Sequence, residues 1–107
     1  HVVEQRPADV QAFVDAWFEA LAWWQANPEE GNALLARLTD VPVDEIAASL
    51  TGVKLLGLPE NQTAFTRGSD NFSLYFTTQE YINFLGTVGM LSIAPDLDAL
   101  LSATFLK

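Results

Sequence analysis

The chain has 107 residues, of which 50% are hydrophobic and 18% charged, and its formal net charge is −9. A chain of this length has room for one domain with a single core, and its acidic balance argues against binding to nucleic acid or to an anionic membrane surface. The sequence contains no cysteine, which excludes disulfides, thiolate nucleophiles and cysteine-based zinc sites.

The first predicted elements are a short strand and a long helix. Val2 and Val3 stand between polar residues, a pattern typical of a short strand. Pro7 then opens a helical pattern that runs to about Ala26. Apolar residues recur there at spacings of three and four and form one stripe, made of Val10, Phe13, Val14, Trp17, Leu21 and Trp24.

A second face of the same helix is also apolar. It lies roughly 100–130° from the centre of the first stripe by helical periodicity, and its members are Ala12, Ala16, Ala20 and Trp23. Alanines four residues apart form a smooth surface that another backbone can approach closely. The pattern therefore predicts a helix buried on two sides. We interpret Trp23 as a packing residue in preference to one that stacks on a ligand.

Two further helices follow directly. Asn27, Pro28 and Glu30 fit the N-cap, first and third positions of a helix that presents Leu34, Leu35 and Leu38. A third helix begins near Pro42, with acidic residues in its first turn that favour the helix dipole, and ends at Gly52.

The remainder of the chain reads as a connection and two more helices. Residues 53–65 are broken by glycine and proline, which predicts an extended segment with one helical turn after Pro59. A capping-box pattern at residues 77–80 marks a helix that ends at Gly89, with Ser73 as an alternative, earlier start. A short final helix opens at Pro95. The fold class is thus mainly α, with four to five short helices and at most one or two short strands.

The chain offers few groups for catalysis or metal binding. Its single histidine is the first residue, so no internal imidazole is available as a base or ligand. Three acids, Asp40, Asp44 and Glu45, could be read as a cation site, but their spacing fits no calcium loop and their places at helix starts explain them better. Asp96 and Asp98 are interpreted in the same way. We expect no enzymatic activity, no cofactor and no metal.

The order of these elements resembles the C-terminal segment of a family of solute-binding proteins. The resemblance rests on Asn27-Pro28-Glu29 after a long helix, on "EIAASL" at residues 45–50, and on "YINFL" at residues 81–85. The family is the nitrate/sulfonate/taurine type that serves ABC importers, with the thiamine-precursor binders as relatives. The similarity extends from about Val10 to Leu106, and the ordered set is more specific than any single motif.

The resemblance implies a fold, a function and a compartment. Residues 1–107 would form a single helical segment, the C-terminal part of a two-lobed α/β periplasmic-binding-protein-like (type II) fold. Its role would be scaffolding, its partners the remainder of the protein and, through it, an ABC permease, and its location periplasmic or otherwise extracytoplasmic. A small anionic or heterocyclic solute would bind only the full-length protein. The alternative is an autonomous small helical domain for protein–protein interaction.

No ligand-binding residue can be carried over from the family to this chain, because the family's ligand contacts lie mostly outside the matching segment. The residues we single out are instead those of a lobe-packing or partner-packing face: Ala12, Ala16, Ala20 and Trp23. Because this face would be uncovered in the isolated chain, we also expect the isolated chain to form a homodimer through it.

Overall fold

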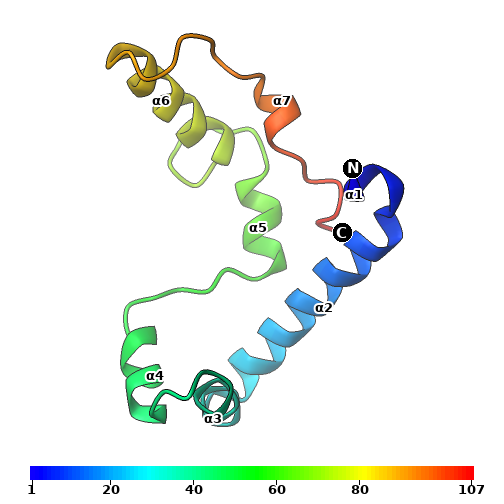
Figure 1. Ribbon diagram of the computed structural model, residues 1–107, viewed down its shortest axis with the longest axis vertical. Helices are drawn as coiled ribbons and strands as arrows, with labels where there is room; N and C mark the ends of the chain where they lie inside the picture. The colour runs from blue at the N-terminus through cyan, green and yellow to red at the C-terminus, as the bar shows by residue number, and fades with distance from the viewer. The chain divides into compact units, whose positions relative to one another are not determined.

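The computed structural model describes residues 1–107 and contains seven helices and no strand (Figure 1). The helices are α1 (Val2–Gln5), α2 (Pro7–Ala26), α3 (Pro28–Thr39), α4 (Val43–Leu50), α5 (Leu58–Ala64), α6 (Leu74–Thr87) and α7 (Leu97–Leu100). The mainly α class is confirmed. The expected count of four to five helices is wrong, because the segment predicted as a strand is helical and the turn after Pro59 belongs to a longer helix.

The chain divides into two compact units. Unit 1, His1–Gly57, contains α1 to α4, and unit 2, Leu58–Lys107, contains α5 to α7. Within unit 1, α3 packs against both α2 and α4, and within unit 2, α6 contacts α7.

The strand predicted at Val2 and Val3 is instead the single-turn helix α1. The turn ends at Arg6, whose backbone leaves the helical region with φ −136° and ψ 53°. Arg6 precedes Pro7, and the proline ring disfavours helical conformation in the residue before it. The proline thus separates α1 from α2 and starts α2 at its first position.

Asn27 is the residue that joins α2 to α3. This residue occupies the N-cap position of α3, as predicted, but its side chain does not cap that helix. Its Nδ2 instead donates a hydrogen bond of 2.8 Å to the carbonyl oxygen of Trp23, so it closes the end of α2. The expected capping box with Glu30 is therefore absent, while Pro28 begins α3 as predicted.

Left-handed residues terminate α3 and α6. Gly89, after α6, has φ 73°, the conformation that the sequence predicts for a glycine at this position. Gly52 also has a positive φ, 82°, but α4 already ends at Thr51, which is extended, and Gly52 belongs to the turn that follows. Asp40, after α3, adopts φ 56° although it is not glycine. Its backbone N–H and that of Val41 both donate to the carbonyl oxygen of Ala36, which satisfies the end of the helix.

Unit 2 is organised around Ser73, the N-cap of α6. The Ser73 hydroxyl donates to the carbonyl oxygen of Thr66 at 2.9 Å and accepts from the backbone N–H of Gly68 at 3.1 Å and of Phe76 at 3.5 Å. The capping box expected at residues 77–80 is wrong, because these residues lie inside α6, whereas the alternative start at Ser73 is confirmed. Ser73 is only 4% exposed, which makes it the one buried polar side chain of the chain.

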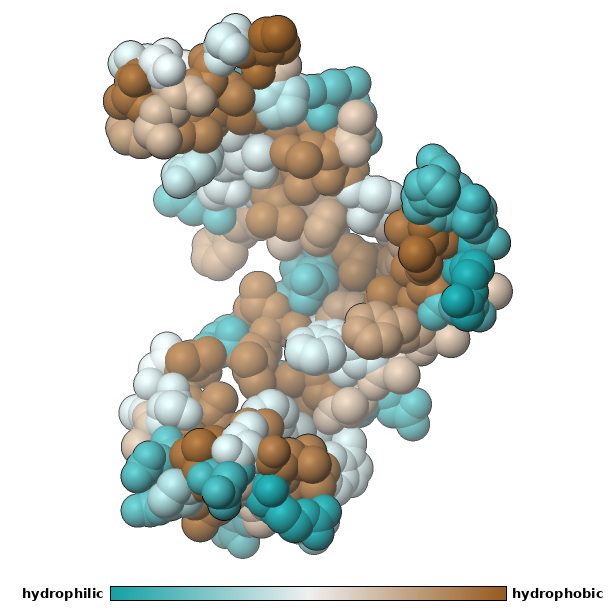
Figure 2. Space-filling model, in the orientation of Figure 1, coloured by the Kyte–Doolittle hydropathy of each residue, from teal (hydrophilic) through white to brown (hydrophobic).

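The hydrophobic core is small for the number of apolar residues. Only three apolar side chains are buried, namely Leu21, Ile46 and Ile82. The total accessible surface is 8116 Å², whereas even two separate globular proteins of half this mass would together expose about 7,100 Å². Hydrophobic side chains accordingly reach the surface in both units (Figure 2).

Candidate functional site

The long helix α2 presents an exposed apolar surface, which we call the α2 face. It consists of Ala12, Phe13, Ala16, Trp17, Ala20 and Trp23, all of them exposed. By helical periodicity these residues occupy an arc of roughly 140°. Phe13 is 72% exposed and Trp17 60%, while Leu21 is the only buried residue of the helix.

The predicted packing residues all lie on this face. Trp23 is 44% exposed, and the three alanines of its stripe are exposed as well. Two members of the first stripe, Phe13 and Trp17, are also open to solvent. Within this chain, therefore, neither apolar stripe of α2 is fully covered along its length.

The two adjacent tryptophans have different surroundings. Trp24 points at α3, where its indole Nε1 donates a hydrogen bond of 2.9 Å to Asn32 Oδ1. Its ring lies over Gly31, at which an added Cβ would come within 2.1 Å of the indole Cδ1. Trp24 is thus the anchor that holds α3 on α2, and Trp23 remains on the exposed face.

A hollow runs along one edge of the α2 face. Its volume is about 210 Å³, and its lining is apolar, with Trp17, Ala20, Leu21 and Trp24 from α2 and Leu55 and Leu56 from the segment after α4. A hydrogen bond of 3.1 Å from Gln25 Nε2 to the carbonyl oxygen of Leu55 fixes that segment beside the helix. Such a hollow has the size to accept one large apolar side chain.

A second apolar hollow lies on the other side of Trp24. Its volume is about 160 Å³, and it lies between Ala20 and Trp23 of α2 and the leucines of α3, which are Leu34, Leu35 and Leu38. Leu38 is 72% exposed at its margin. Ala20 and Trp24 line both hollows, so the apolar surface continues from the 53–57 segment across α2 to α3.

The charged residues of α2 are all acidic. Asp9 forms an ion pair with Arg6, which precedes the helix. Asp15 accepts a hydrogen bond of 2.8 Å from Gln11 Nε2 but has no ion pair, and Glu19 has no charged partner. Periodicity places Asp15 and Glu19 along the edge of the α2 face that adjoins Trp23.

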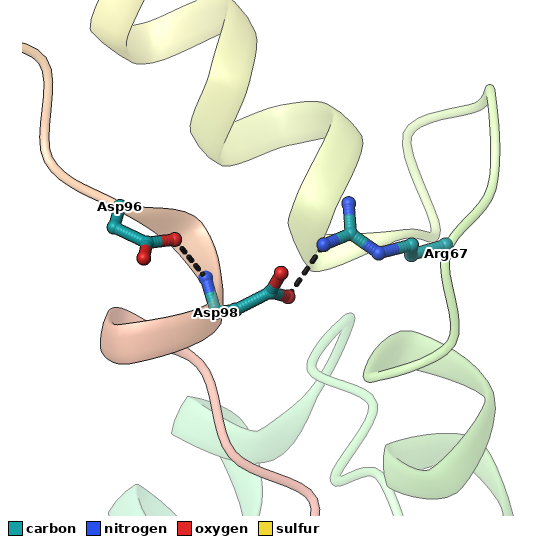
Figure 3. A network of polar contacts seen from close by, with 3 residues as sticks. All are labelled: Arg67, Asp96 and Asp98. Carbon is teal, nitrogen blue, oxygen red and sulfur yellow. Dashed lines mark hydrogen bonds and ion pairs between the residues drawn. The ribbon is translucent and has the colours of Figure 1, made fainter.

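Unit 2 contains a separate polar cluster that the sequence did not reveal. The Arg67 guanidinium lies 4.3 Å from the centre of the Tyr75 ring. It also forms an ion pair with Asp98 (Figure 3). Asp96 caps α7 by accepting a hydrogen bond of 2.9 Å from the Asp98 backbone N–H. The interpretation of Asp96 as a helix-start acid is therefore correct. Asp98 also lies in the first turn of α7, and in addition it forms the ion pair with Arg67.

No group of three or more histidine, aspartate or glutamate side chains is arranged to hold a metal ion. No helix combines the length and the apolar character needed to cross a membrane. Of the acids considered as a cation site, Asp44 and Glu45 lie in the first turn of α4, as interpreted. The interpretation of Asp40 as a helix-start acid is wrong, because it ends α3 in the left-handed conformation.

Comparisons of the chain with protein-family models, with curated proteins and with solved structures found no match.

Proposed function

We propose that this chain is the C-terminal part of a solute-binding protein that serves an ABC importer for small anionic or heterocyclic solutes. In that protein it acts as a scaffold, and the remaining polypeptide covers the α2 face and supplies the ligand contacts. The finished protein delivers its solute to a permease on the outer side of the cytoplasmic membrane.

The observation that carries the proposal is the exposed apolar surface of α2. Aromatic side chains contribute roughly 150–250 Å² each when fully buried, and Phe13, Trp17 and Trp23 retain 72%, 60% and 44% of their exposure. These three residues alone therefore present about 350 Å² of surface. The largest apolar patch on a soluble monomer covers roughly 300–600 Å² and is often functional.

The order of motifs along the chain is the reason for proposing this particular family of solute-binding proteins. The Asn27-Pro28-Glu29 junction joins α2 to α3, residues 45–50 lie in α4, and residues 81–85 lie in α6. This succession is similar to the C-terminal segment of the nitrate/sulfonate/taurine binders. A scaffolding role agrees with the chain's small inventory of catalytic or metal-ligating groups.

The decisive experiment compares the intact product of the gene with the isolated chain. We expect mass spectrometry of the protein from its native cells to show a polypeptide about three times as long, in the periplasmic or extracytoplasmic fraction. Calorimetric titration of that product with nitrate, taurine, other sulfonates and pyrimidines should give a micromolar constant for at least one. The isolated 107 residues should bind none of them. A native product of only this length, or a long product that binds no such solute, would overturn the proposal.

A second candidate, an autonomous interaction domain, is favoured by the internal packing of unit 1. Trp24, Gly31 and Asn32 join α2 to α3, and Ile46 of α4 is buried. Such a unit can present the α2 face to a separate protein. Under this candidate the native product is short and a second protein, not a small solute, copurifies with it in stoichiometric amount.

A further inference from the structure

The large and small side chains of the α2 face alternate in the way expected of a surface that binds another helix. Phe13, Ala16, Ala20 and Trp23 follow one another at spacings of three, four and three residues, the spacing of a helix–helix seam. The two large rings lie at the ends of the seam, and we call the stretch of small side chains between them the saddle. Ala20 and Trp23, at one end, also line the hollow that the leucines of α3 border. A partner helix can approach closely over the alanines and place a large side chain between the rings.

The acidic side chains around this seam favour a basic partner helix. Unit 1 carries nine acidic against three basic side chains, a net charge of −6. Helix α2 itself contains no lysine or arginine, and Arg6 neutralises only Asp9. Glu19 flanks the seam on the side of Trp23, with Asp15 one turn before it.

The basic residues of unit 1 do not neutralise the acidic edge formed by Asp15 and Glu19. Arg37 lies in the last turn of α3, and Lys54, next to Leu55 beyond the opposite edge of the face, already has an interaction of its own. A second copy of the chain would bring another acidic edge and a further −9 charges to the same face. A helix with lysine or arginine along one edge has the complementary charge.

We propose that the α2 face binds an amphipathic helix with large apolar side chains on its contact stripe and lysine or arginine beside that stripe. The apolar side chains fill the saddle between Phe13 and Trp23, and the cations face Asp15 and Glu19. The inference rests on the proposed function only in that both require this face to be covered. Loss of peptide binding would leave solute binding by a longer gene product unaffected, and the reverse also holds.

The test uses the 107-residue chain and synthetic helices of about 21 residues, long enough to be helical in part. One peptide carries leucine at the contact positions and lysine beside them, and contains no tryptophan. A matched peptide has glutamate in place of every lysine, and a third has the lysine composition in scrambled order. Tryptophan emission of the chain and calorimetry report binding.

We expect the lysine helix to bind and the glutamate helix and the scrambled peptide to bind at least tenfold more weakly. Affinity for the lysine helix should fall as salt rises, because ionic screening shortens from about 30 Å at 0.01 M to about 8 Å at 0.15 M. Equal binding of the lysine and glutamate helices would overturn the assigned charge. Binding of none of the peptides, with self-association of the chain instead, would assign the face to a second copy.

Two pairs of variants locate the site. Ala16→Gln fills the saddle and should weaken binding of the lysine helix at least tenfold. Ala22→Gln, at another exposed alanine on the opposite side of α2, should leave binding unchanged. Glu19→Gln should weaken binding about two- to fivefold and reduce its salt dependence. Glu80→Gln, which removes one charge from α6 in unit 2, is its control. If the two members of either pair behave alike, the helix does not bind at this face.

Discussion

The indole of Trp24 lies directly on the backbone of Gly31, so closely that an added Cβ at Gly31 would overlap the ring at 2.1 Å. The two residues are seven positions apart, on either side of the turn at Asn27, and the neighbouring Asn32 accepts the indole N–H. Glycine is therefore required at position 31 for close approach, since its backbone is in ordinary helical conformation.

Replacing Gly31 with alanine should destabilise unit 1. Alanine is favoured over glycine in a helix by about 1 kcal/mol, but overlap with the rigid indole should outweigh this and lower the free energy of unfolding by about 1–3 kcal/mol. Urea unfolding measures the change, followed by tryptophan emission for unit 1 and by circular dichroism for the helices of both units. The matched control is Gly86→Ala in α6, where an added Cβ meets nothing within 4 Å. Gly86→Ala should be as stable as the parent chain or more stable. A Gly31→Ala variant as stable as the parent would contradict the prediction, because it would show that α2 and α3 can move apart at no cost.

Removing the hydroxyl of Ser73 should destabilise unit 2. Ser73→Ala leaves the backbone N–H of Gly68 and the carbonyl oxygen of Thr66 without this partner, and it removes the N-cap of α6. We expect the free energy of unfolding to fall by about 0.5–2 kcal/mol, the usual cost of replacing an N-cap serine with alanine. Thermal unfolding monitored by circular dichroism provides the measurement. Ser102→Ala, at an exposed serine, should change stability by less than about 0.5 kcal/mol; equal losses in both variants would refute a special role for Ser73.

The ion pair of Arg67 with Asp98 should contribute little to stability. Both side chains are more than half exposed, and exposed pairs contribute roughly 0–1 kcal/mol. Asp98→Asn should therefore lower the unfolding free energy by less than about 1 kcal/mol, and the difference from the parent should shrink at high salt. Arg67→Ala should have a larger effect, because it also removes the cation over the Tyr75 ring. Denaturant unfolding at two salt concentrations distinguishes the ion pair from the contact between Arg67 and the Tyr75 ring. A large, salt-independent effect of Asp98→Asn would contradict the expectation that the ion pair contributes little.

Without a basic partner, the isolated chain should self-associate weakly through the α2 face. Each chain contributes a few hundred Å² of apolar surface, less than the roughly 800 Å² that each partner buries in a typical stable interface. Since the two chains repel each other at −9 each, raising the salt should strengthen the association, the opposite of its effect on the lysine helix. Light scattering at tens of micromolar checks this.

The comparison for self-association is Trp23→Lys, which should abolish it, with Phe72→Lys at an exposed position of unit 2 as the control. A chain that stays monomeric at high salt would rule out this use of the α2 face. So would a Trp23→Lys variant that associates as well as the parent.

Local signals were sufficient to predict much of the helical structure. The prolines at 7 and 28 begin α2 and α3, and Gly89 follows α6 in the left-handed conformation that ends a helix. These features depend on backbone geometry within a few residues, so composition and spacing reveal them. The same rules failed at Val2 and Val3, where apolar β-branched residues form one helical turn before a proline.

The site residues depend on contacts that spacing alone does not specify. Ser73 is buried because the chain from Thr66 to Gly68 folds back on its hydroxyl, and Trp24 is an anchor because α3 crosses it at a glycine. The α2 face could be located from the sequence, since Ala12, Ala16, Ala20 and Trp23 share one helical edge. Its exposure could not, because exposure depends on which elements pack beside the helix.

All three tryptophans of the chain lie in α2, and none lies in unit 2. The intrinsic tryptophan emission of the protein is therefore a signal from unit 1 alone, whereas circular dichroism reports the helices of both units. If the two units unfold as one, the two signals must give the same transition. A difference between their midpoints would measure directly how far each half of the polypeptide is stable without the other.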